Sequence, residues 1–139
     1  EEEMGHEEWI LDDLRICGND PAAVRHAPPA PATELMVAYA YDVVQRCNPI
    51  GFFGMVLVLE GTSVRIACEA AGAIQRSLRL PDGAFRYLTS HGALDQGHMV
   101  SFEGLMNRIG EPQDREMVVH CANMFYRLYG DVFRSIATQ

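Results

Sequence analysis

Three side chains that can bind metal ions or transfer protons share one face of a predicted helix: His91, Asp95 and His98. Separations of four and three residues place them within about 60° of one another around the helix axis. Burying a carboxylate and two imidazoles costs several kcal/mol unless a metal ion or a complete hydrogen-bond network offsets that cost. The spacing alone leaves a metal site and a fully hydrogen-bonded polar patch equally open. The same face carries apolar residues, so we expect it to be buried: Leu88, Leu94, Phe102 and Leu105.

Glu60 is a second polar residue in an apolar setting. It falls between Leu57 and Val64 on the apolar face of its predicted helix, so its carboxylate is expected to point inward. The alternative is that Glu60 pairs with an arginine such as Arg65, or extends to the edge of the bundle.

The start of the chain holds a third candidate, His6. It lies one turn before Ile10 on the apolar face of the first predicted helix, and Glu3 lies three residues before it. The alternative is a solvated histidine, because His6 is so close to the first residue.

Together these segments give a pattern that none gives alone. Glu3-x-x-His6, Glu60 and Asp95-x-x-His98 supply a carboxylate and a histidine, a lone carboxylate, and again a carboxylate and a histidine. Carboxylate-bridged diiron bundles use a Glu on each of two helices and Glu-x-x-His on each of two others. We therefore predict a dinuclear metal site, and we expect the fourth ligand-bearing helix before residue 1.

Periodicity and helix-end signals predict the elements that must position these residues. We expect an all-α fold with no strand, organised as one helical domain over residues 1–139. The stretch from Asp20 to Ala32 holds four prolines and is predicted to be a connecting loop, after which Thr33 caps a helix. Five helices are predicted, around Trp9–Cys17, Leu35–Cys47, Gly51–Arg79, Phe85–Ile109 and Glu111–Ile136.

Composition excludes several classes of protein. The 139 residues include 11 Lys and Arg and 19 Asp and Glu, for a net charge of −8. Nucleic-acid binding is not expected, because affinity for phosphates needs a basic surface. The longest unbroken apolar run, Phe52–Leu59, is too short to cross a bilayer, so we expect no membrane contact.

The remaining candidates are given structural roles. The four cysteines form no C-x-x-C pair and are expected to be reduced, which favours a cytoplasmic protein. His26 is expected to be solvated in the proline-rich loop, and His120 to be a surface or supporting histidine rather than a ligand.

The chain resembles the heme-oxygenase-like diiron oxidases, also described as iron-containing redox enzymes. The matching stretches are the opening EEEMGHEEW, Glu60 within VLVLEGT, and SHGALDQGHMVSFEGL around the last cluster. The resemblance implies a heme-oxygenase-like helical bundle of which this chain is the C-terminal part, without the N-terminal helices. It implies that the metal ligands are His6, Glu60, His91, Asp95 and His98, with Glu3 as a substitute for the early carboxylate of the family.

The function implied by this resemblance is a non-heme diiron oxygenase or oxidase. It would hold two Fe(II)/Fe(III) ions, use dioxygen as co-substrate, and oxidise a small amino-acid-like or fatty-acid-like molecule. Two alternatives stay open: a non-catalytic helical binding module derived from the same fold, and a ferritin-like metal-binding protein. Since the chain is short, a homodimer could complete its core.

Overall fold

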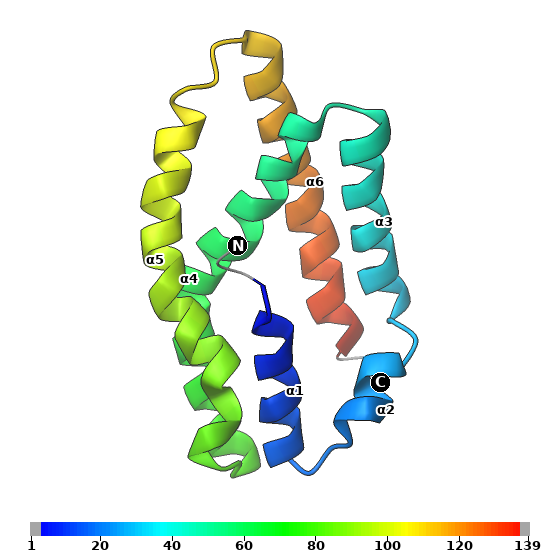
Figure 1. The fold of residues 1–139 in the computed structure, drawn as a ribbon, viewed down its shortest axis with the longest axis vertical. Helices are drawn as coiled ribbons and strands as arrows, with labels where there is room; N and C mark the ends of the chain where they lie inside the picture. Colours follow the sequence, from blue (N-terminus) through cyan, green and yellow to red (C-terminus); the bar gives the residue numbers. More distant parts are fainter. Residues whose placement is uncertain (1–3, 137–139) are drawn as a thin grey trace. The chain divides into compact units, whose positions relative to one another are not determined.

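The described part of the protein consists of helices and contains no strand, which confirms the predicted all-α class. The computed structural model describes residues 4–136, apart from the side chains of Ala93, Leu94 and Gln96, so Glu3 and the side chain of Leu94 lie outside it. In chain order the elements are α1 (His6–Ile16), α2 (Pro21–His26), α3 (Pro31–Arg46), the 3-10 helix η1 (Pro49–Gly51), α4 (Phe52–Leu78), the 3-10 helix η2 (Asp82–Phe85), α5 (Arg86–Met106) and α6 (Pro112–Ile136) (Figure 1).

The chain folds into two compact units. The first unit comprises Glu1–Pro28 and Ser63–Gln96, and the second comprises Pro29–Thr62 and Gly97–Gln139. Helices α4 and α5 each contribute one part to each unit.

The core of the second unit forms where α3, η1 and the start of α4 meet α6, with α3 and α6 side by side (Figure 1). Gly54 allows the closest approach, because a Cβ built there would lie 2.5 Å from the backbone nitrogen of Ala122. The hydroxyl of Tyr39 donates a hydrogen bond to Cys121 Sγ at 3.6 Å. Burial and this contact raise the pKa of Tyr39 above its ordinary value of 10.0, so the hydroxyl stays a donor at neutral pH. The buried residues at the centre are Val43, Val58, Cys121 and Phe125.

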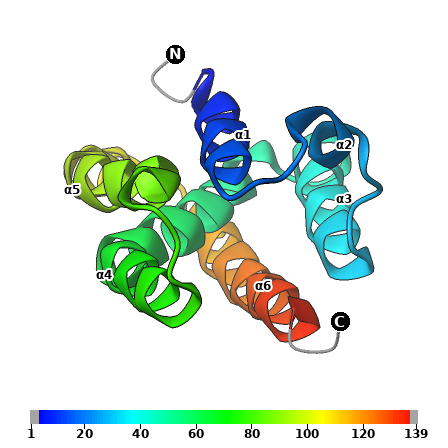
Figure 2. The same ribbon diagram turned by 90° about the horizontal axis from the view of Figure 1, so that it is seen from below.

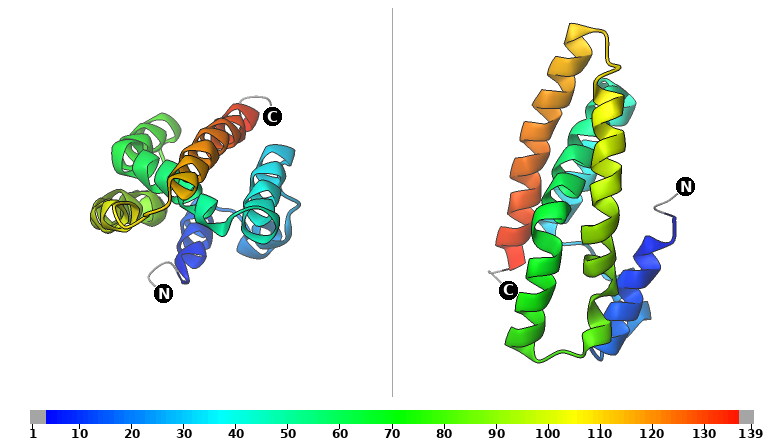
Figure 3. Two further views of the ribbon diagram at one scale, coloured as in Figure 1. Left: turned by 90° about the horizontal axis from the view of Figure 1, so that it is seen from above. Right: turned by 90° about the vertical axis from the view of Figure 1, so that its left-hand side faces the viewer.

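The first unit is built on the turn between α4 and α5. Ala71, Ala84 and Phe85 form its buried cluster, with Leu80 and Leu88 packed against it. Helix α1 contacts α2 (Figure 2) and also lies against η2, beside the start of α5 (Figure 3). This packing places the first helix of the chain next to the helix that carries His91.

The proline-rich stretch differs from its prediction, and the structure has six α-helices in its described part rather than five. The stretch holds α2, because the Asp20 side chain accepts a hydrogen bond from the Ala22 amide and Pro21 occupies the first helical position, where a missing N–H costs nothing. Thr33 is not a cap, because α3 begins two residues earlier. Its first residue is Pro31, which again occupies a position where a missing N–H costs nothing.

The segment Pro49–Leu78 is long and apolar enough to cross a membrane, with a mean hydropathy of 1.5 over its most apolar window. The sequence expectation considered only the unbroken run Phe52–Leu59 and so underestimated this length. The core helix of a bundle passes the same length and composition test; here 22% of the window is buried, and Val58, Ala67 and Ala71 are among the buried residues of the helix. The segment is therefore weak evidence for a membrane span.

We predict that Gly54→Ala lowers the melting temperature by roughly 5–10 °C, because the new methyl group would collide with the backbone of α6. Gly104→Ala is the matched control, since a Cβ at Gly104 meets nothing within 4 Å and alanine favours the helix. Thermal unfolding followed by circular dichroism compares the two, and equal melting temperatures would refute the close approach.

Candidate metal centre

Two histidines from distant parts of the sequence face one another in the first unit. His6 Nδ1 lies 3.2 Å from His91 Nε2. The other ring nitrogen of His91, Nδ1, lies 3.0 Å from the carbonyl oxygen of Tyr87. A carbonyl only accepts hydrogen bonds, so His91 Nδ1 carries the proton. His91 Nε2 therefore presents its lone pair to His6, which is the state that a metal ligand requires.

The separation of these nitrogens suits a shared metal ion. At metal–nitrogen distances of about 2.1 Å, tetrahedral and octahedral ions hold neighbouring nitrogens about 3.0–3.4 Å apart. The observed 3.2 Å falls in this range and equally allows a hydrogen bond from His6 to His91. The distance therefore suits a shared ion as well as a shared proton.

Aromatic and charged neighbours hold this pair in place. The Trp9 ring stacks on His6 with 4.0 Å between centroids, and the Tyr87 ring lies 4.1 Å from that of His91. The Arg86 guanidinium sits 4.5 Å above the Trp9 ring, within the range of a cation–π interaction. The alternative of a fully solvated His6 is therefore not what the structure shows: His6 is partly buried between rings.

Asp13 anchors α1 to the start of α5, and sequence reasoning missed it. Its carboxylate accepts hydrogen bonds from the amides of Arg86 at 3.1 Å and Tyr87 at 2.8 Å. These are two of the orphan amides at the N-terminus of α5, where a negative charge is also favoured by the helix dipole. Asp13 is only 8% exposed. A signal was present, because Asp13 lies four residues after Trp9 on the helix face that carries His6.

Close packing of α4 against α5 sets the position of His91 from the other side. A Cβ built at Gly92 would lie 2.6 Å from Cys68 Sγ, so this position is too tight for a larger residue without movement of Cys68. His91 itself is 8% exposed. The imidazole is thus removed from water by its own helix pair, as the sequence pattern predicted.

Asp95 is the most deeply buried acid of the predicted set. It is 1% exposed and follows His91 by one turn on α5. The sequence prediction that this acid is withdrawn from solvent is confirmed. A buried carboxylate of this kind is a hard oxygen ligand of the type that iron accepts.

The second unit holds a carboxylate–imidazole pair. His98 Nδ1 lies 3.8 Å from Glu60 Oε2, and the two side chains are 21% and 24% exposed. The alternative that Glu60 serves a surface arginine is less well supported, since Arg65 is exposed and Glu60 faces His98. An oxygen and a nitrogen donor together match the mixed ligand preference of non-heme iron.

The structure brings the predicted ligands together as pairs. In the described residues, no group of three His, Cys, Asp or Glu side chains is gathered closely enough to hold an ion by itself. Glu3 lies outside the described residues, so the complete ligand set stays a prediction. His26 and His120 are exposed, as expected for residues without a role as ligands.

Comparisons with known proteins agree with this chemistry. The sequence matches the family described as "Iron-containing redox enzyme" over residues 1–130. A crystal structure of a domain of unknown function with a heme oxygenase-like fold, from Shewanella denitrificans OS217, superposes with a TM-score of 0.83 at 27% identity. The match covers 98% of this chain and 60% of that chain, so this chain spans less than two thirds of the length of its neighbour. No curated protein matches the sequence.

We predict that Asp13→Ala loosens α1 from α5 and lowers the stability of the protein by about 1–2 kcal/mol, the usual cost of losing a helix cap. Trp9 reports this directly, because it is the one tryptophan of the chain and stacks on His6. Its emission should shift to longer wavelength in Asp13→Ala. Asp12→Ala is the control: among the described residues, Asp12 pairs with Arg15 alone, on the surface of the same helix. An unchanged Trp9 spectrum in Asp13→Ala would show that the anchor is dispensable.

Proposed function

We propose, since this chain belongs to the family of iron-containing redox enzymes, that it is a non-heme diiron oxygenase or oxidase acting on a small organic substrate. The observation that carries the proposal is the pair His6 Nδ1 and His91 Nε2, 3.2 Å apart, with the proton of His91 held on the opposite nitrogen. An imidazole in this state can bind an ion through Nε2, and His6 Nδ1, which donates a hydrogen bond to that nitrogen here, would bind the same ion after losing its proton.

The proposed ligands fall into two sets. His6, His91 and Asp95 would hold iron in the first unit, with Glu3 as a further carboxylate, and Glu60 and His98 would supply ligands from the second. Iron bound by such ligands supplies the chemistry, because it reacts with dioxygen and provides the oxidising power for attack on carbon or nitrogen.

The remaining residues of the first unit hold these ligands ready. The Tyr87 carbonyl keeps the His91 proton on Nδ1, and the stacked Trp9 ring limits rotation of His6. Asp13 fixes the helix of His6 to the helix of His91. Burial of His91 and Asp95 keeps water away and strengthens charge interactions at these ligands.

Iron analysis tests the proposal. We expect two irons per chain after purification in Fe(II) under reducing conditions, and a loss of at least one in His91→Ala and in His98→Ala. The control variants His26→Ala and His120→Ala replace exposed histidines and should keep the parent content. A parent chain without iron would leave a non-catalytic helical module, and many irons per assembly would indicate storage.

Trp9 gives a second measurement that needs no substrate. Open-shell metal ions quench the fluorescence of a nearby indole, and the Trp9 ring lies 4.0 Å from that of His6. We predict that Co(II) or Fe(II) quenches Trp9 in the parent and in His26→Ala, but not in His91→Ala. Quenching that survives in His91→Ala would remove this histidine from the ligand set.

A further inference from the structure

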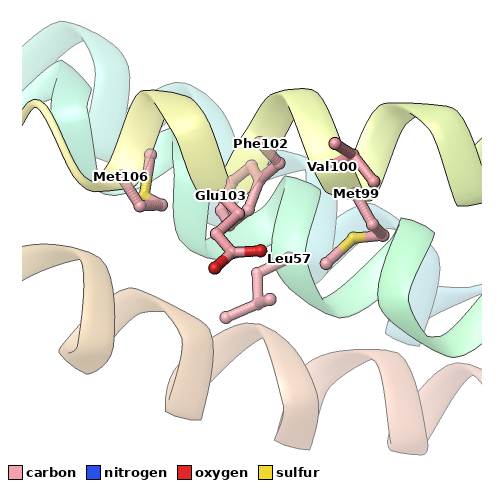
Figure 4. A pocket seen from close by; sticks show the side chains of 6 residues that line it. All are labelled: Leu57, Met99, Val100, Phe102, Glu103 and Met106. Carbon is pink, nitrogen blue, oxygen red and sulfur yellow. The ribbon is translucent and has the colours of Figure 1, made fainter.

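An apolar groove of about 460 Å³ lies in the second unit between α4 and α5 (Figure 4). This volume is in the range of sites for small molecules. The groove contains one charged side chain, Glu103, and its other lining residues are apolar: Leu57, Met99, Val100, Phe102 and Met106.

The groove begins beside the Glu60–His98 pair. Leu57 lies one turn before Glu60 on α4, and Met99 directly follows His98 on α5. A Cβ built at Gly61, the neighbour of Glu60, would lie 3.9 Å from the terminal methyl group of Met99. From Met99 the groove follows α5 to Met106, about 10.5 Å further along the helix axis.

The negative charge of Glu103 determines which small molecules the groove favours. In the part of the chain that the structure describes, no hydrogen bond or salt bridge engages the Glu103 carboxylate, and Figure 4 shows it extending from α5 toward Leu57. The nearest ligand pair contributes another carboxylate, Glu60. A fatty acid placed here would meet two like charges, whereas an ammonium group would meet a partner.

We propose that this groove binds an aliphatic amine, with the ammonium group on Glu103 and the hydrocarbon chain along Leu57, Met99 and Phe102 toward Glu60 and His98. Primary amines are protonated at neutral pH, as the lysine side chain is. Glu103 follows His98 by five residues, or about 7.5 Å along the helix, so the chain and not the nitrogen lies next to the proposed ligands. The binding of the amine does not depend on the proposed function. Its role as the substrate does.

Calorimetric titration of the whole chain, without added iron, tests the binding. The probes are n-octylamine, 1-octanol and octanoate, which share a hydrocarbon chain and differ in the charge of the head group. We expect octylamine to bind at least about tenfold more tightly than octanoate, with octanol between them. Glu103→Gln should weaken octylamine about fivefold and leave octanol unchanged. Glu103→Lys should reverse the order of octylamine and octanoate.

Two further variants complete the design. Glu116→Gln removes the same charge from an exposed position on α6 and should bind all three probes as the parent does. Leu57→Trp should weaken all three, because the larger side chain would occupy the groove. Equal binding of octylamine and octanoate, no binding of any probe, or identical behaviour of Glu103→Gln and Glu116→Gln would overturn the proposal. Iron content is measured separately, so either proposal can fail while the other stands.

Discussion

The hydrogen bonds from two backbone amides to one carboxylate hold the candidate site of the first unit together. Asp13 binds the amides of Arg86 and Tyr87, and the Tyr87 carbonyl in turn holds the proton of His91. The first residues of α5 are therefore linked to α1 on one side and to the imidazole of His91 on the other. Since both amides belong to a helix N-terminus, they would need a partner in any case. The same contacts thus give the first amides of α5 their hydrogen-bond partner and hold His91 in position beside His6.

Helix α5 provides the second constraint, because its own geometry relates the ligands to one another. In the first unit it carries His91 and Asp95 one turn apart, so their spacing is set by the helical repeat, and in the second unit it carries His98. Glycines allow neighbouring helices to approach more closely than any residue with a side chain would. Gly92 does so for the side chain of Cys68, and Gly54 for the backbone of Ala122. Next to His91, the small residue Gly92 therefore allows α5 to approach α4 closely.

The sequence could predict what depends on local periodicity and on misplaced polar residues. The long helices α4, α5 and α6 follow from their apolar spacing, and the burial of His91 and Asp95 follows from their place in that spacing. It could not predict α2, because the prolines of that segment suppress helix signals although one of them occupies the favoured first position. Asp13, like Glu60, is an acidic residue on a buried helix face. Its partners are backbone amides, which every residue has, so the sequence could not identify them. The groove at Glu103 was also out of reach, because which helix faces stay uncovered is decided by packing between helices.

The proposed amine position has a chemical consequence for a metal-dependent oxidase. A free amine is itself a ligand for transition metals and would compete with dioxygen for open coordination positions. A carboxylate about 7.5 Å along the helix from His98 counters this, because its charge favours the protonated ammonium form, which has no lone pair to offer. The hydrocarbon segment between the head group and the end of the groove at Met99 is then the part nearest to Glu60 and His98. In such a site the acid selects the substrate by charge and also determines which of its atoms is exposed to oxidation, so charge recognition and the choice of reacting atom depend on the same residue.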